Sequence, residues 1–125
     1  MEKFERLKQS MNAHAMQEYP LECVGIVTKD FEYVPCMNIS DQPKNSFILD
    51  PADLIKNDGN IWGIFHSHPG EENPIPSKED KVSAAFQEYK FLVGFNNKFY
   101  LYWLDHNVDA LIFDEFKEEH LVNKS

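Results

Sequence analysis

The chain has 125 residues, of which 42% are hydrophobic and 14% aromatic, and a formal net charge of −9. This length and composition fit one globular domain with a single core. The acidic balance argues against a nucleic-acid partner, because phosphate binding needs a basic surface. No run reaches the roughly 18 apolar residues of a membrane span, and the charged N-terminus does not resemble a signal peptide. We therefore expect no membrane partner and a cytoplasmic location.

Residues 2–18 are predicted to form a helix, because apolar side chains recur there at helical spacing. These side chains are Phe4, Leu7, Met11, Ala15 and Met16. The Tyr19-Pro20 pair ends the helix, since the residue before proline avoids the helical region. The apolar run 21–28 then predicts a strand, and residues 31–36 predict its antiparallel partner across a short turn.

The middle of the chain alternates loops with short elements. Residues 37–46 are predicted as a loop and residues 47–49 as a short strand. Asp50 and Pro51 suit the N-cap and first position of a helix that ends at residues 57–60. A buried strand from residue 61 follows. The next helix is predicted over residues 77–89, with one apolar face made of Val82, Ala85, Phe86 and Tyr89.

The last third predicts strands at residues 91–95, 99–104 and 109–116, followed by a charged, frayed tail at 117–125. The order of elements predicts a single α/β layered sandwich over residues 1–125, a mixed sheet flanked by helices, with its core at about residues 10–116. We expect one of Tyr102 and Trp103 to face solvent.

Cysteines and histidines outside residues 61–80 have simpler interpretations. Cys23 and Cys36 could form a disulfide, but two reduced, buried thiols are the preferred interpretation. His14, His106 and His120 have no paired spacing and are interpreted as surface residues.

One stretch, residues 61–80, concentrates side chains that bind metals. His66 and His68 are two residues apart in a predicted strand, so both side chains point to the same face. Asp80 follows in the first turn of the next helix. Two imidazoles and a carboxylate are ligands that zinc accepts, and a catalytic zinc leaves its fourth position to water.

A hydrolytic zinc site also needs a base that takes a proton from water. Glu22 is the candidate, because it is the one charged residue in an apolar run where a carboxylate is costly without a partner or a task. Ser77 could supply a hydroxyl donor to a developing oxyanion. Simpler alternatives remain open: Glu22 as an exposed strand residue, Ser77 and Asp80 as a helix capping box, and Glu71 and Glu72 as a solvated loop.

Together these residues resemble the motif of the JAMM (MPN+) zinc metallopeptidases: a glutamate, then His-x-His-Pro, then Ser-x-x-Asp. The resemblance covers roughly residues 10–105. The segment around Glu22 resembles the one that holds the family's glutamate. The segments around Asn38, Phe47 and Asp50 resemble the prokaryotic and phage branch, and most of all the N-terminal JAMM domain of tail-tip assembly proteins of lambda-like phages.

The resemblance implies a cytidine-deaminase-like fold and hydrolysis of a peptide or isopeptide bond in a protein or peptide substrate. It implies one zinc ion bound by His66, His68 and Asp80. Glu22 would be the general acid and base, and Ser77 would steady the tetrahedral intermediate. A place in phage tail assembly would make tail proteins its partners and the virion tail a second location.

This sequence departs from the family in two ways. Seven residues, 70–76, separate Pro69 from Ser77 where the common pattern has six. The addition falls in a loop, where insertions are tolerated, so we expect the ligands to remain in place. Phage relatives often continue into a cysteine peptidase domain of the NlpC/P60 kind. This sequence contains no such domain, so we expect a partner hydrolase of that kind to be a separate chain.

Two other functions compete with the peptidase. One is a JAMM fold kept as a non-catalytic assembly module of a phage tail, which need not preserve five polar site residues. The other is a zinc deaminase of nucleotides, whose signature has a glutamate two residues after the first ligand and then Pro-Cys-x-x-Cys. Position 68 is a histidine here and no Cys-x-x-Cys occurs, which argues against the deaminase.

Overall fold

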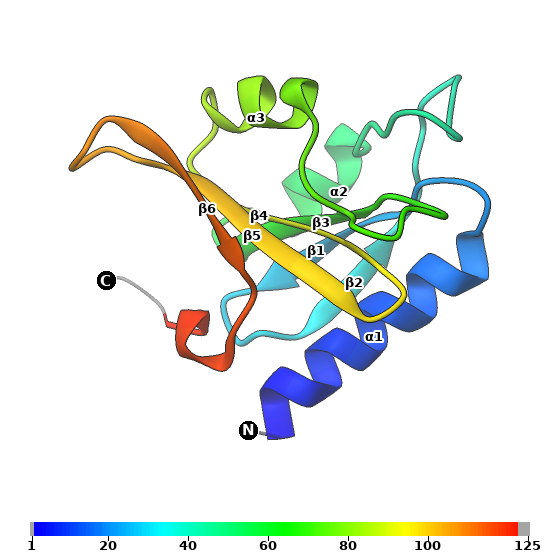
Figure 1. Ribbon diagram of the computed structural model, residues 1–125, viewed down its shortest axis with the longest axis horizontal. Helices are drawn as coiled ribbons and strands as arrows, with labels where there is room; N and C mark the ends of the chain where they lie inside the picture. The colour runs from blue at the N-terminus through cyan, green and yellow to red at the C-terminus, as the bar shows by residue number, and fades with distance from the viewer. Residues whose placement is uncertain (1, 123–125) are drawn as a thin grey trace.

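The computed structural model describes residues 2–122, which fold around a six-stranded mixed sheet (Figure 1). The strands are β1 (Val24–Thr28), β2 (Tyr33–Cys36), β3 (Ile61–Ser67), β4 (Lys90–Phe95), β5 (Lys98–Asp105) and β6 (Ala110–Glu115). Their order in the sheet is β2-β1-β3-β4-β5-β6. The β3–β4 pair is parallel, and the other four pairs are antiparallel. The predicted α/β class with a mixed sheet is confirmed.

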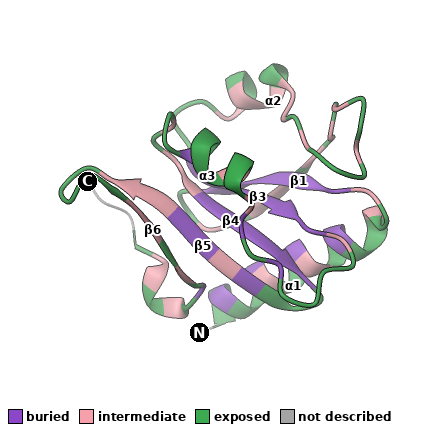
Figure 2. Cartoon of the chain, turned by 45° about the horizontal axis from the view of Figure 1, so that its top comes forward, coloured by how far each residue is buried: buried purple, intermediate pink, exposed green. Residues whose placement is uncertain are grey.

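Helices cover the sheet on both faces. They are α1 (Glu2–Glu18), α2 (Pro51–Lys56), α3 (Lys78–Ala84) and the short 3-10 helix η1 (Glu118–His120). In Figure 1, α1 lies against one face of the sheet, and α2 and α3 lie over the other. Figure 2 shows the buried residues concentrated in the central strands, and β3 is buried along its whole length. A strand covered on both faces must be apolar throughout, which explains its continuous hydrophobic run.

Helix α1 has the predicted bounds and packs by Phe4, Leu7, Met11 and Ala15 of the predicted stripe, whereas Met16 is 50% exposed. His14 lies on the same buried stripe, so the expectation of a surface histidine is wrong. Its Nδ1 lies 2.6 Å from the hydroxyl oxygen of Tyr33 in β2. This contact supplies the polar partner that a buried imidazole requires.

Two predicted strands differ from the structure. The first begins only at Val24, because the backbone before it leaves the regular ladder: the Glu22 N–H donates to the carbonyl of Pro43, and the Cys23 N–H donates to the side-chain hydroxyl of Ser67. Residues 47–49 make one isolated bridge, between Leu49 and Asn38, and form no strand.

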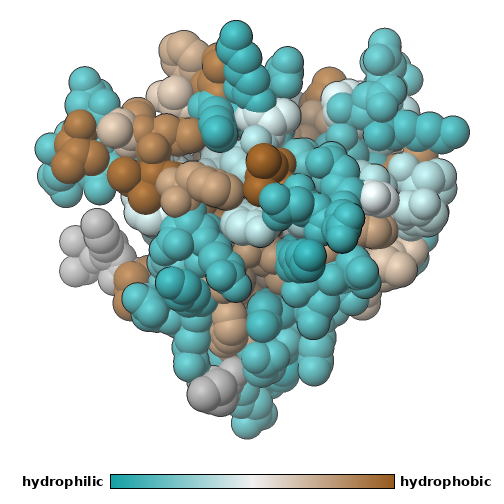
Figure 3. Space-filling model, viewed as in Figure 1, coloured by the Kyte–Doolittle hydropathy of each residue, from teal (hydrophilic) through white to brown (hydrophobic). Residues whose placement is uncertain are grey.

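Helix α3 is shorter than predicted. It ends at Ala84, which is its buried residue, while Val82 and Phe86 are 54% and 85% exposed. The prediction of an apolar face made of Val82, Ala85, Phe86 and Tyr89 is wrong, because α3 lies above a groove and packs on the sheet through the side that carries Ala84. Figure 3 shows hydrophobic side chains gathered near α3 and the β5–β6 end, on an otherwise mostly hydrophilic face.

The described part of the C-terminal tail is ordered, contrary to the prediction. After the buried Phe116, η1 folds back, Leu121 packs against the core on the α1 side, and the indole N–H of Trp62 donates to the carbonyl of Val122 at 3.0 Å. Residues 123–125 of the predicted tail lie outside the described residues.

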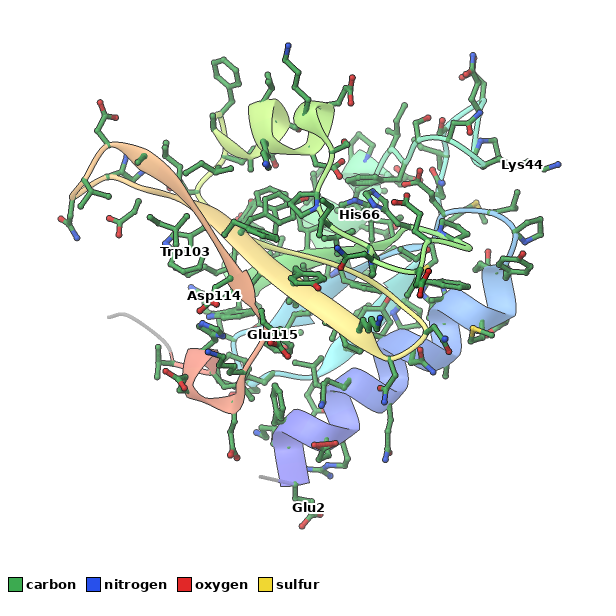
Figure 4. The ribbon with its side chains drawn as sticks, viewed as in Figure 1. Glu2, Lys44, His66, Trp103, Asp114 and Glu115 are labelled. Carbon is green, nitrogen blue, oxygen red and sulfur yellow. The ribbon has the colours of Figure 1, made fainter. Side chains whose placement is uncertain are left out.

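Tyr102 and Trp103 point to opposite faces, as strand alternation requires. Tyr102 is buried on the α2 and α3 side, and the ammonium of Lys90 lies over the ring of Trp103. Trp103, labelled in Figure 4, is half-buried against the core on the α1 side. The expectation that one of them faces solvent is wrong, because η1 places the ring of His120 beside Trp103.

Cys23 and Cys36 are free thiols, as the preferred interpretation states, but only Cys23 is buried and Cys36 is half-buried. Over residues 2–122, no helix has both the length and the apolar composition needed to cross a membrane.

Gly94 is required where β4 turns into β5, since a Cβ there would lie 2.5 Å from the carbonyl oxygen of Lys98. We expect Gly94→Ala to lower the free energy of unfolding by about 2 kcal/mol, because backbone must move. Urea denaturation measures this. Gly59→Asn is the matched control, because position 59 has φ +79° and no atom within 4 Å of a Cβ, and asparagine tolerates that conformation. Equal losses in the two variants would refute the steric explanation.

Candidate metal centre

Strand β3 places two histidines beneath α3. His66 is fully buried between Val24 of β1 and Val93 of β4. His68 follows the strand, and its N–H donates to the carbonyl of Gly94 at 3.1 Å. The two Nε2 atoms lie 3.3 Å apart, so the side chains converge as their spacing predicts. Figure 4 shows His66 between the sheet and α3.

Asp80 reaches the histidines from the first turn of α3. Ser77 is the N-cap: its Oγ accepts from the Asp80 N–H at 3.1 Å, and Asp80 Oδ2 accepts from the Ser77 N–H at 2.9 Å. The same Oδ2 lies 3.1 Å from Nε2 of His66 and 3.1 Å from Nε2 of His68. The capping box therefore exists, and it also aims the carboxylate at both imidazoles.

The spacing of these three atoms fits a zinc ion. Zinc bonds of about 2.0–2.1 Å in a tetrahedron hold neighbouring ligand atoms about 3.3 Å apart. The triangle formed by the two Nε2 atoms and Asp80 Oδ2 has edges of 3.1, 3.1 and 3.3 Å. Two neutral imidazoles and one carboxylate are also the donor types that zinc prefers.

Glu22 lies beside this triangle and is buried, with 7% of its surface exposed. The interpretation of Glu22 as an exposed strand residue is therefore wrong. Ligand-type atoms of Glu22, His66 and His68 lie within 4.8 Å of one another and could themselves hold a metal ion. Burial raises the pKa of the Glu22 carboxyl to about 7, although the charge of His68 opposes the shift.

The electrostatics of the other three residues favour an ionised Asp80. Burial acts to raise the pKa of Asp80, but hydrogen bonds from His66 and His68 outweigh it and hold the pKa far below its ordinary value. Burial lowers the pKa of His66. Burial also acts to lower the pKa of His68, but the hydrogen bond and charge of Asp80 raise it overall.

The longer loop between Pro69 and Ser77 is tied down by β5. The Lys98 ammonium donates to the carbonyl of Glu72 at 3.1 Å, and the Tyr100 hydroxyl donates to Asn73 Oδ1 at 2.7 Å. Glu71, interpreted as a solvated residue, is exposed but places Oε2 3.4 Å from Nδ1 of His68. The extra residue thus leaves the two histidines and Asp80 together.

A groove of about 760 Å³ opens over the metal centre, between α3 and the segment that leads into α2. Its polar end contains Glu22, His68 and Asp80. Its other walls combine apolar side chains, Phe47, Ile48, Leu49, Leu54, Ile64, Phe91 and Tyr102, with polar ones that include Lys44, Asn45, Ser46, Glu79, Ser83 and Gln87. A groove with mixed polar and apolar walls suits an extended peptide segment, which offers both kinds of group.

Sequence reasoning assigned no role to Asn38 or Phe47. The ring of Phe47 stacks on His66, with centroids 4.3 Å apart and planes at 20°. Asn38 bonds to the carbonyl of Glu22. Both positions belong to segments that resemble the prokaryotic branch, and that resemblance was the available signal.

Comparison with known proteins agrees with this geometry. The family model described as prokaryotic homologs of the JAB domain matches residues 4–109. The chain belongs to this family. The matched range includes strands β1 to β5 and ends just before β6, and it contains the four residues of the candidate metal centre.

Two relatives of this JAB domain differ in how much of their length they share with it. The tail tip assembly protein K of Escherichia phage N15 is 40% identical over 77 residues, which cover 58% of this chain and 31% of the phage protein. Desampylase of Haloferax volcanii is 27% identical over 103 residues, which cover 69% of this chain and 73% of desampylase. The chain therefore matches about a third of the first relative and most of the second.

Proposed function

We propose that this protein is a zinc-dependent hydrolase of peptide or isopeptide bonds. The observation that carries the proposal is the triangle of His66, His68 and Asp80 atoms at zinc-ligand spacing, with the buried carboxyl of Glu22 beside it. The JAB family and the match to desampylase support a hydrolase.

In this mechanism His66, His68 and Asp80 hold the metal. When bound, zinc acidifies a water and polarises a carbonyl oxygen. Glu22 receives the proton of the attacking water and delivers it to the leaving nitrogen. A carboxyl whose pKa lies near 7 suits both steps, because it accepts and releases protons near neutral pH.

Ser77 stabilises the negative oxygen of the tetrahedral intermediate. Its Oγ accepts the Asp80 N–H, which leaves the hydroxyl proton available as a donor. The groove beside the site binds the acyl side of the substrate as an extended segment.

The match to the phage tail tip assembly protein supports a setting in tail assembly. There the substrate or partner is a tail protein or an NlpC/P60-type hydrolase on another chain, and the protein acts in the infected cell or the tail. The second candidate function is a non-catalytic assembly module, favoured by the same match and by the exposed Phe86 in the turn after α3.

The test uses zinc-loaded protein and two fluorescent probes, a linear peptide and a ubiquitin-like protein joined by its C-terminus to a lysine side chain. We expect cleavage of at least one probe, loss of cleavage with a zinc chelator, and recovery when zinc is added back. A zinc-loaded protein that cleaves neither the probes nor any tail protein of its own phage would favour the assembly module.

A further inference from the structure

The loop between β2 and α2 contacts the metal centre at two separate points. Its Phe47 stacks on the ring of His66, and its Pro43 carbonyl accepts the Glu22 N–H at 2.7 Å. One loop therefore touches both a proposed metal ligand and the proposed base.

The contact with His66 matters because that ring lacks the usual support. Zinc-binding histidines normally donate their second ring nitrogen to a carboxylate or carbonyl, which fixes the ring. Among residues 2–122, no hydrogen-bond partner reaches the buried Nδ1 of His66. The ring of Phe47, whose plane lies 20° from that of the imidazole, packs instead against the face of His66.

A single side chain, Asn38, organises the loop. Its Nδ2 donates to the carbonyls of Glu22 at 2.9 Å and Ser46 at 3.0 Å. Its Oδ1 accepts the N–H groups of Ser40 and Ile48, both at 3.0 Å. These bonds use both donors and both lone pairs of the amide, and the two carbonyls on one side and two N–H groups on the other fix which atom is nitrogen.

The four bonds connect the two halves of the site. Ser46 and Ile48 flank Phe47 in the chain, so the Asn38 amide bonds the backbone on both sides of the residue that stacks on His66. The same amide nitrogen bonds the carbonyl of Glu22. One asparagine thus bonds both the backbone of Glu22 and the backbone on either side of the residue that stacks on His66.

We propose that Asn38 is a positioning residue of the metal centre, which holds Glu22 and, through Phe47, His66 in their working arrangement. The role of the centre rests on the function proposed above. Neighbours of metal ligands typically change metal affinity or activity by about 10- to 100-fold when they are altered, and a small misplacement of a catalytic group is similarly costly.

The sharpest variant is Asn38→Asp. It keeps the size of the side chain and the oxygen that accepts two N–H groups, but it replaces the donor nitrogen by an oxygen that faces the carbonyls of Glu22 and Ser46. In the metal-free protein we expect amide hydrogen exchange at Glu22 to accelerate about tenfold or more, while amides within β3 keep their protection. In the zinc titration, with a chromophoric chelator as competitor, we expect affinity to fall about 10- to 100-fold.

Asn57→Asp is the matched control. Asn57 also donates its amide to a backbone carbonyl, that of Asp53 at 2.8 Å, at the end of α2 and outside the groove lining. We expect its zinc affinity to equal that of the wild type. Phe47→Leu is the second test variant: it keeps apolar bulk and all Asn38 bonds, so zinc affinity should fall while Glu22 exchange stays unchanged.

An Asn38→Asp variant whose zinc affinity and Glu22 amide exchange rate both equal those of the wild type would overturn the proposal. If Asn38→Asp fails to fold, an unchanged zinc affinity in Phe47→Leu overturns it instead. If the wild type itself binds no zinc, the proposed function fails. The positioning role is then decided by Glu22 exchange and by the His66 ring shifts in NMR spectra of the variants.

Discussion

Replacing Glu22 by glutamine should lower the rate of hydrolysis by about 10²- to 10⁴-fold, the usual contribution of a general acid and base. Glutamine has the shape of glutamate but cannot accept a proton from water. The measurement is kcat on whichever probe the wild type cleaves, in samples matched for zinc content.

The zinc content of Glu22→Gln separates two roles of this residue. Glu22 lies close enough to His66 and His68 to act as a ligand itself. As a base, it can be replaced without loss of zinc. Loss of zinc together with activity would identify Glu22 as a ligand and refute its assignment as the base.

The same variant should be more stable than the wild type when both are free of metal. The Glu22 pKa rises from an ordinary value near 4.5 to about 7 on folding. Between these values the unfolded chain releases a proton that the folded protein retains, so wild-type stability falls as pH rises through this window. We expect Glu22→Gln to gain about 2 kcal/mol at pH 8 and almost nothing at pH 4. Urea denaturation at both pH values measures this, and an equal effect at both would contradict the cause.

Replacing Asp80 by asparagine should lower zinc affinity by about 100-fold or more, since the carboxylate ligand loses its charge. Asparagine Oδ1 can still accept the Ser77 N–H, so the cap of α3 remains. Zinc affinity should therefore fall with little change in the helical circular dichroism signal of the metal-free protein.

Glu79→Gln is the control for Asp80→Asn. Glu79 precedes Asp80 in the same turn of α3 and is exposed, so its loss removes equal charge without removing a ligand. An equal fall in zinc affinity in both variants would show that general acidity of the groove, not ligation by Asp80, attracts the metal.

The sequence predicts the centre well where local periodicity decides geometry. His66 and His68 share a face because strand alternation requires it, and the Ser77 cap fixes Asp80 within one turn. Each of these relations spans three residues or fewer. The strands of the sheet can also be predicted locally, because each coincides with a short apolar run.

The errors occur where tertiary packing decides. His14 looks like any helix-surface histidine until Tyr33 from another element meets it. Val82 and Phe86 have helical spacing, but α3 stands over a groove instead of on the core. Asn38 looks like an ordinary loop asparagine, because its partners lie up to 16 residues away and are backbone atoms with no sequence signature.

The most direct measurement is the number of zinc ions per chain, by elemental analysis of the wild type and His68→Ala after incubation with zinc and removal of the excess. His68 contributes one corner of the ligand triangle and lies beside the groove. We expect about one zinc in the wild type and none in the variant. A wild type without zinc, or a variant that retains it, would contradict a metal centre at these residues.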